Sequence, residues 1–327
     1  MTKILIIGAT GYLGKRLVEA LVRRGRDQVY GIARTEAKAK LLAIAEVTPI
    51  LCADPINEPS AYLKAIRDYH IDTVVDVGGA NADSTKFLEE IKKVGKERIE
   101  KYKTIGNHRF PKLGFIYCSG TWVHGSDRKP VNDLDVVGLG PLNPPSLVAW
   151  RVNLEKCILA SVDILDVAIL RPALIYGYEG TIWTPFFLPL LEAVRNGTPG
   201  TTPDSVQIPL TFDSKPGLIH LDDVATGFEK AIEKLQLINN GSVYPVFDLV
   251  TSQESMSDIF TALALCWGYK GQIELVGPGD NLFAEAMSTT MRGSSARAKQ
   301  LLGWEPMKLN GYIADMDRYA AAFASKH

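Results

Sequence analysis

The chain has 327 residues, of which 46% are hydrophobic and 22% charged, as in an ordinary globular protein with a large core. Its 36 basic and 37 acidic residues leave a net charge of −1, so charge gives no reason to expect nucleic acid or an anionic membrane as a partner. No apolar run approaches the roughly 18 residues that a membrane span needs.

The first half of the chain alternates short apolar runs with amphipathic stretches. Because strands that are apolar on both faces and alternate with helices pair in parallel through right-handed crossovers, we predict an α/β fold. Its core is expected to be a doubly wound parallel sheet of the Rossmann type. The predicted strands lie at 3–7, 29–33, a run ending at 51–54, 72–77, 114–120 and 167–170, and the predicted helices at 12–24, 60–69, 85–103 and 146–160.

The amino-acid composition changes after Tyr176. Residues 177–218 are rich in Gly, Pro and Thr and contain the apolar helix FFLPLLEAV. We assign 1–176 to a dinucleotide-binding domain and 177–327 mainly to a smaller C-terminal substrate lobe, with a return into the sheet near 242–250. The later expected elements are LIHLDDVA, YPVFDLV, a helix at 255–267, QIELVG, and helices at 294–302 and 309–324.

A glycine-rich loop follows the first strand directly and opens the first helix. Gly8 permits a tight turn, Gly11 lets the backbone approach a pyrophosphate, and Gly14 lets helix and strand pack closely. The helix N-terminus then offers free N–H groups and a positive dipole end to the phosphates. We therefore expect the loop to hold a dinucleotide through Gly8, Thr10, Gly11, Tyr12, Leu13 and Gly14.

The end of the second strand indicates which dinucleotide is bound. A site for NAD usually carries an acidic residue there to hold the ribose hydroxyls, whereas this chain has Arg34, with Arg16 as possible support. A guanidinium suits a 2′-phosphate, so we expect NADP (NADPH) rather than NAD, although a solvated arginine is the alternative. Asp54, just past the third strand, is expected to hydrogen-bond the adenine or to serve only its turn.

Several motifs spread over most of the chain resemble the short-chain dehydrogenase/reductase superfamily. The resemblance is to its extended branch of NAD-dependent epimerase/dehydratase-like proteins, with some character of the nitrogen-metabolite-repressor-like branch. It implies a Rossmann fold that binds a nicotinamide dinucleotide. The motifs are GATGYLG (8–14), YCSGTWVHG (117–125), RPALIYG (171–177), LIHLDDVATG (218–227) and SSARAKQLLGWEP (294–306).

The resemblance also implies a catalytic tyrosine and lysine one helical turn apart, with a serine or threonine on the preceding strand. In this chain Leu147 stands at the tyrosine position and Arg151 at the lysine position, with the register set by Glu155. The strand residue falls at Gly120, next to Thr121. Leucine has no proton to give and arginine keeps its charge, so the usual dyad is absent.

Four residues are predicted to act in its place. Thr121, Tyr176 and His124 are proposed proton donors, and Arg151 is expected to donate to the ribose hydroxyls or to a substrate oxygen. The alternatives are a core tyrosine, a structural histidine, and a surface arginine paired with Glu155. Three tryptophans could wall an apolar pocket or simply pack in the core, namely Trp122, Trp150 and Trp183.

These observations favour an atypical NADP-dependent oxidoreductase that transfers hydride to a small, fairly apolar carbonyl or imine. Two alternatives remain open: a non-redox isomerase or cyclase on the same scaffold, and an NADP-binding regulatory protein without turnover. We expect a small-molecule substrate, no nucleic acid and no membrane, and either a monomer or a homodimer. The four cysteines lie far apart without metal-site spacing, which fits a reducing cytoplasm and no metal.

Overall fold

Seven parallel strands form the central sheet, in the order β11-β7-β5-β4-β1-β2-β3. The computed structural model describes residues 1–78, 83–106, 110–138, 143–197, 205–239 and 241–327. The strand order runs one way from β1 to β3 and the other way from β4 to β11, so the predicted doubly wound sheet is confirmed. The strands are β1 (Thr2–Ile7), β2 (Asp27–Ala33), β3 (Thr48–Leu51), β4 (Thr73–Asp76), β5 (Leu113–Cys118), β7 (Leu165–Pro172) and β11 (Val246–Leu249).

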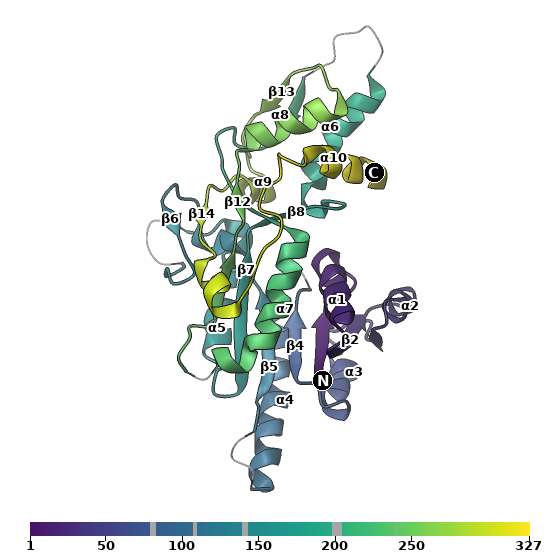
Figure 1. Ribbon diagram of the computed structural model, residues 1–327, viewed down its shortest axis with the longest axis vertical. Coiled ribbons are helices and arrows are strands. Elements are labelled where there is room, and N and C mark those ends of the chain that lie inside the picture. Colours follow the sequence, from purple (N-terminus) through teal and green to yellow (C-terminus); the bar gives the residue numbers. More distant parts are fainter. Residues whose placement is uncertain (79–82, 107–109, 139–142, 198–204, 240) are drawn as a thin grey trace.

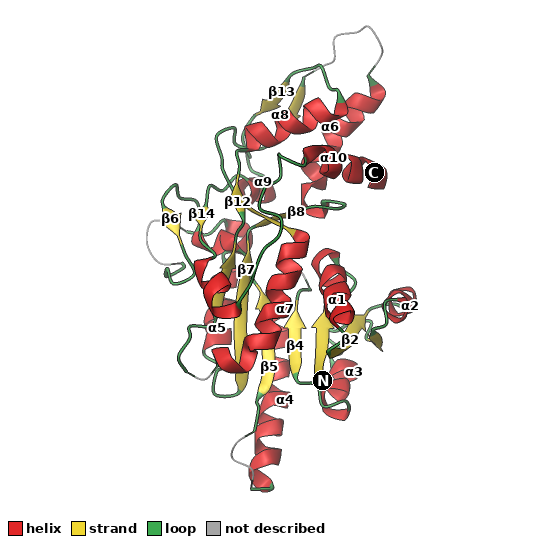
Figure 2. Ribbon diagram, viewed as in Figure 1, coloured by secondary structure: helices red, strands yellow, loops and turns green. Residues whose placement is uncertain are grey.

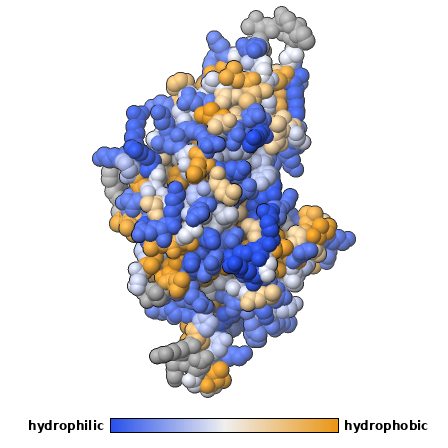
Figure 3. All heavy atoms as spheres, in the orientation of Figure 1, coloured by the Kyte–Doolittle hydropathy of each residue, from blue (hydrophilic) through white to orange (hydrophobic). Residues whose placement is uncertain are grey.

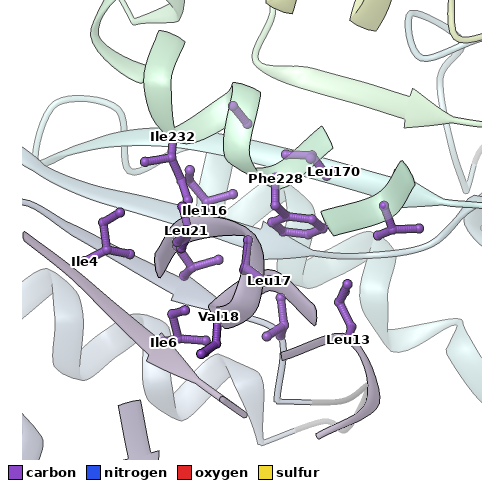
Figure 4. Packing of buried hydrophobic residues seen from close by; sticks show 14 of the residues in the cluster. Ile4, Ile6, Leu13, Leu17, Val18, Leu21, Ile116, Leu170, Phe228 and Ile232 are labelled. Atoms are coloured by element: carbon purple, nitrogen blue, oxygen red, sulfur yellow. The ribbon is translucent and has the colours of Figure 1, made fainter. Parts of the chain in front are cut away.

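Helices cover both faces of this sheet (Figures 1 and 2). On one face α1 and α7 pack side by side, and Figure 4 shows Leu17 and Leu21 of α1 meeting Phe228 and Ile232 of α7 over the sheet. The other face is covered by α3, α4 and α5. Each large apolar side chain buried in these layers stabilises the fold by roughly 1.5–3 kcal/mol. The helices are α1 (Tyr12–Arg24), α2 (Glu36–Ile44), α3 (Ser60–Asp68), α4 (Ser84–Thr104), α5 (Trp150–Leu159) and α7 (Leu221–Ile238).

Most of the remaining elements gather beyond the carboxyl ends of the strands, at the top of Figure 1. They enclose a third apolar core that includes Trp183, Phe187 and Phe260. The helices are α6 (Thr184–Asn196), α8 (Met256–Trp267), α9 (Leu282–Met287) and α10 (Met316–Lys326). Small sheets join β8 (Leu174–Tyr176) with β10 (Gly217–His220) and β12 (Ser252–Gln253), β9 (Val206–Ile208) with β13 (Ile273–Leu275), and β6 (Pro130–Val131) with β14 (Arg292–Gly293).

Some elements differ from the sequence-based expectation. Helices α2 and α9 were not predicted, and α7 packs on the large sheet although its residues lie in the second half of the chain. The helix expected at 146–160 is broken into a short turn at Ser146–Val148 and α5, and the helix expected from 309 begins at Met316. The stretch LIHLDDVA divides into β10 and α7, because His220 caps α7 by accepting the Asp222 N–H at 3.1 Å.

The outer surface is mixed in character. In Figure 3 the hydrophobic residues of this face lie in separate groups among hydrophilic ones, one of them over α2, where Leu41 and Ile44 are exposed. Among the described helices, none has both the length and the apolar character needed to cross a bilayer.

Candidate functional site

A cavity of about 900 Å³ opens at the carboxyl edge of the large sheet. It begins at the glycine loop after β1 and continues past the ends of β4 and β5 to α5 and β8. The strand order reverses between β1 and β4, and open α/β sheets bind their ligands in the crevice at such a reversal. The cavity therefore lies where the fold favours a ligand.

The glycine loop forms one wall of this cavity. Gly8 has a φ of 86°, and a Cβ on it would lie 2.5 Å from the Gly78 backbone, so only glycine fits. Gly11 precedes α1 without a side-chain cap, and the first turn of α1 holds no acidic residue, which leaves the N–H groups of that turn available to an anion. Gly14 lies behind the wall, where a Cβ would collide with the Gly8 carbonyl oxygen. Of the residues predicted for the loop, Gly8, Thr10, Gly11, Tyr12 and Leu13 line the cavity.

Two cations line the cavity at the end of β2. Arg34 follows the strand, and Lys38 lies on α2 in the first turns of the helix. Within the described part of the chain, neither side chain forms a hydrogen bond or ion pair, so both are available to a ligand. Asp54 also lines the cavity, but its carboxylate accepts hydrogen bonds from Ile56 and Asn57 in its own turn. The bonds from Asn57 hold the pKa of Asp54 below its ordinary value.

The far end of the cavity is built from the end of β5 and the start of α5. Thr121, Gly120, Leu147 and Arg151 all line it. The Arg151 side chain is only 7% exposed, and its Nε atom has no hydrogen-bond partner among the described residues. The structure thus brings Arg151 and Thr121 to one cavity with the glycine loop, and Leu147, which the resemblance sets at the tyrosine position, adds only an apolar side chain to the lining.

Tyr176 and His124 do not line this cavity. Tyr176 is fully buried in the third core, stacked on Tyr312 with ring centroids 4.6 Å apart, and burial raises the pKa of its phenol. His124 is buried against β11, with Nε2 2.7 Å from Oδ2 of Asp248. In these positions neither side chain reaches a ligand in the cavity.

His124 lies beside a buried network of charged side chains, and this network shows which residue pairs with Glu155. Arg171 binds both oxygens of Glu155, at 3.1 and 2.5 Å, and its Nη1 lies 3.7 Å from Asp248. Arg151 is therefore neither a surface residue nor the partner of Glu155, because that carboxylate belongs to Arg171.

Asp76 is a cavity residue that the sequence analysis missed. It ends β4, is 2% exposed, and accepts the Gly78 N–H on Oδ1 at 2.9 Å, while Oδ2 has no partner among the described residues. Burial raises the pKa of the Asp76 carboxyl to about 6, against opposing effects of the Gly78 amide, the Ser84 hydroxyl and the Arg151 charge. The only sequence signal for Asp76 was a carboxylate that closes an apolar strand.

Ser119 and Lys38 were missed as well. The Ser119 hydroxyl is buried against the cavity and, among the described atoms, has no partner. The described residues contain no group of three or more His, Cys, Asp or Glu side chains placed to hold a metal.

The chain is similar in sequence to one protein family and to a curated relative. Residues 4–246 match the model of the NAD dependent epimerase/dehydratase family. A curated relative, an isoflavone reductase homolog A622-like protein of Nicotiana tabacum, is 26% identical over 249 residues, which is 73% of this chain and 66% of the relative. The match thus spans slightly less than two thirds of that relative.

Solved structures share the fold at low identity. UDP-glucose-4-epimerase from Stenotrophomonas maltophila, with bound NAD, has a TM-score of 0.67 and 17% identity over 100% of this chain and 98% of its own. dTDP-glucose 4,6-dehydratase from Bacillus anthracis, in complex with NAD, has a TM-score of 0.69 and 15% identity over 100% and 97%. A functionally unknown protein from Silicibacter pomeroyi has a TM-score of 0.68 and 17% identity over 98% and 99%.

Proposed function

Because the chain belongs to the NAD dependent epimerase/dehydratase family, we propose that it is an atypical NADP-dependent oxidoreductase acting on a small, fairly apolar carbonyl or imine. One observation carries the proposal. One cavity connects two different sites. One end holds the N-terminus of α1, which has no side-chain cap, and the cations Arg34 and Lys38. The other end holds Thr121 and Arg151 among apolar side chains. A nicotinamide dinucleotide needs the first of these features and a reducible substrate needs the second.

The nucleotide is proposed to lie along the glycine loop. Gly11 and the first turn of α1 would receive the pyrophosphate, and Arg34 with Lys38 would hold a 2′-phosphate. Asp54 lies at the adenine end, although its carboxylate is already engaged by its own turn. When bound, NADPH supplies a hydride. The protein's part is to hold and orient the nucleotide and to shape the space beside it.

The substrate is proposed to occupy the opposite end. The side chains that line this end are mostly carbon, namely Trp122, Leu147, Ile182 and Phe283, and the nearby polar groups are Thr121, Ser119, Asp76 and Arg151. Such walls favour a compact, apolar molecule with one polar group. The relative from Nicotiana tabacum carries a reductase name, which supports a reduction here.

Proton supply distinguishes this proposed enzyme from the family pattern. Leu147 cannot donate a proton, and Tyr176 and His124 lie outside the cavity. Of the donors that the sequence suggested, the Thr121 hydroxyl and water admitted to the cavity remain, and the Ser119 hydroxyl lines the same cavity.

The test is single-turnover oxidation of bound NADPH, followed by absorbance across a panel of aldehydes, ketones, enones and imines. We expect at least one class to oxidise the nucleotide at a catalytically useful rate. Gly11→Val, which should fold without binding nucleotide, is the matched control. A silent panel with NADPH bound stoichiometrically would reject the oxidoreductase in favour of an isomerase, a cyclase or a regulatory protein.

A further inference from the structure

Arg151 is a buried cation without a counter-ion in the described part of the chain. Its side chain is 7% exposed, it lines the cavity, and Nε makes no hydrogen bond. Its Cζ atom lies 5.6 Å from the centroid of the Trp150 ring. A guanidinium taken out of water is costly to the fold unless an anion or hydrogen-bond acceptors compensate it.

The neighbouring carboxylates do not supply this compensation. Glu155 lies one turn along α5 but is held by Arg171. Asp76 influences Arg151 electrostatically, yet the two form no ion pair within 4 Å, and Oδ2 of Asp76 is itself without a partner. The N–H donors of Arg151 are therefore available to a ligand in the cavity.

Gly120 explains how the guanidinium reaches this position. A Cβ on Gly120 would lie 2.8 Å from Nη1 of Arg151. The φ of Gly120 is −175°, a conformation open to any residue, so a side chain here would not strain the backbone but would displace the end of the Arg151 side chain. Nη1 thus occupies the volume into which a side chain at the end of β5 would otherwise project.

We propose that Arg151, in the space left by Gly120, is an oxyanion-binding residue, and that it binds the enolate oxygen formed from an α,β-unsaturated carbonyl substrate. This rests on the proposed reductase function and names its substrate class. A guanidinium stabilises a negative oxygen but does not protonate it. The oxyanion should therefore be one that survives without an immediate proton.

The chemistry of reduction then favours an enone over an isolated ketone. Hydride addition to an isolated ketone leaves the whole charge on one strongly basic alkoxide oxygen, which calls for an acid at once. Addition to the β-carbon of an enone forms a C–H bond there and moves the C=C pair toward the carbonyl, so the charge is shared between oxygen and the α-carbon. Bound NADPH would supply this hydride and become NADP⁺, and water would then give a proton to the α-carbon, which yields the saturated ketone.

The test uses 4-nitrophenol as a stable planar mimic of an enolate. Its phenolate has its own visible absorbance, so the protonation state of the bound probe is read directly. With the full chain saturated with NADP⁺, we expect 4-nitrophenol to bind as the phenolate at a pH where it is mostly neutral in solution. We also expect it to bind about tenfold or more tightly than the neutral isostere 4-nitroanisole.

Three variants show which residues produce the preference for phenolate. Arg151→Gln should abolish the preference for phenolate while circular dichroism shows the fold unchanged, and Arg151→Lys should keep part of it. Gly120→Ala, which crowds Nη1, should weaken phenolate binding and leave 4-nitroanisole unaffected, and it tests the site even if the Arg151 variants do not fold. Equal binding of the two probes, or a preference retained by Arg151→Gln, would overturn the oxyanion site.

The test of the oxyanion site and the test of the proposed function can fail independently of each other. Phenolate binding that depends on Arg151, with no compound of the whole panel oxidising NADPH, would support the oxyanion site and reject the reductase. Oxidation by ketones or imines but not by enones, without a phenolate preference, would keep the reductase and reject this inference.

Discussion

The hydroxyl of Tyr12 donates a hydrogen bond of 2.5 Å to the carbonyl oxygen of Gly177, 165 residues further along the chain. Tyr12 begins α1 and lines the cavity, while Gly177 directly follows β8. The bond therefore ties the glycine loop to the segment that leads into the third core. Burial, reinforced by the charge of Glu179, raises the pKa of the Tyr12 phenol well above its ordinary value, so the hydroxyl stays protonated and donating.

Tyr12→Phe should lower the free energy of unfolding by about 1–3 kcal/mol, because the Gly177 carbonyl loses its partner in a partly buried place. Urea unfolding measures this. Tyr69→Phe is the matched control, since Tyr69 is 42% exposed and its ring packing survives the change. Equal stabilities of the two variants would show that the Tyr12 bond contributes nothing.

Substitutions at two glycines of the first loop should have different effects, one on binding and one on stability. Gly11→Val should keep the fold and lose nucleotide binding, because its Cβ would sit 3.2 Å from the Gly8 carbonyl oxygen and extend into the cavity. Gly14→Ala should instead destabilise the fold, since its Cβ overlaps that same oxygen. Calorimetric titration with NADPH and thermal unfolding separate the two results. A folded Gly11→Val variant that binds NADPH would show that the phosphates lie elsewhere.

Cofactor choice is expected to depend on Arg34 and Lys38. NADPH should bind about tenfold or more tightly than NADH, because each charge-assisted bond to a 2′-phosphate is worth roughly 1.5–3 kcal/mol. Arg34→Ala and Lys38→Ala should each reduce this preference in calorimetric titrations. Arg26→Ala, an exposed arginine before β2 that does not line the cavity, should leave it unchanged. A preference that survives the double variant Arg34→Ala with Lys38→Ala would contradict the assignment.

The glycine loop and Arg34 could be predicted from the sequence because their signal is local. A short apolar strand, a glycine turn and a helix start are consecutive, and α1 runs from Tyr12 to Arg24 as expected. Helix α2 was missed for a related reason. Only Ala39 and Leu42 of that helix are buried, so its apolar pattern is weak and packing against β2 and β3 stabilises it instead.

The rest of the site depends on side-chain direction and on sheet order. Ile175 lines the cavity, and the next residue along β8, Tyr176, points to the opposite side because strand side chains alternate. His124 faces Asp248, and no pattern in the sequence links two residues 124 positions apart. Asp76 reaches the cavity only because β4 lies beside β1 in the folded sheet.

The position of His124 predicts a structural effect. His124→Ala should lower the free energy of unfolding by about 1–3 kcal/mol, because Asp248 loses a hydrogen bond in a fully buried place. NADPH binding per folded molecule should stay the same, since His124 does not line the cavity. Thr121→Val is the reciprocal control, with a small effect on stability and a slower turnover of any substrate found. If His124→Ala instead loses turnover without losing stability, His124 takes part in the reaction.

The last prediction concerns Asp76, whose pKa of about 6 lies above the ordinary value near 3.9. The folded protein holds this proton more tightly than the unfolded chain, so the carboxyl destabilises the fold increasingly as pH rises from about 4 through 6. Asp76→Asn carries no charge, and its amide oxygen can still accept the Gly78 N–H. The variant should therefore match wild type near pH 4 and exceed its stability by about 3 kcal/mol above pH 7, since each pKa unit is worth about 1.4 kcal/mol. Urea unfolding across this pH range measures the difference, with the exposed Asp163→Asn as a control that should show no such trend. If Asp76→Asn is instead the less stable protein at pH 7, the Arg151 charge outweighs burial and Asp76 is a stabilising counter-ion of that arginine.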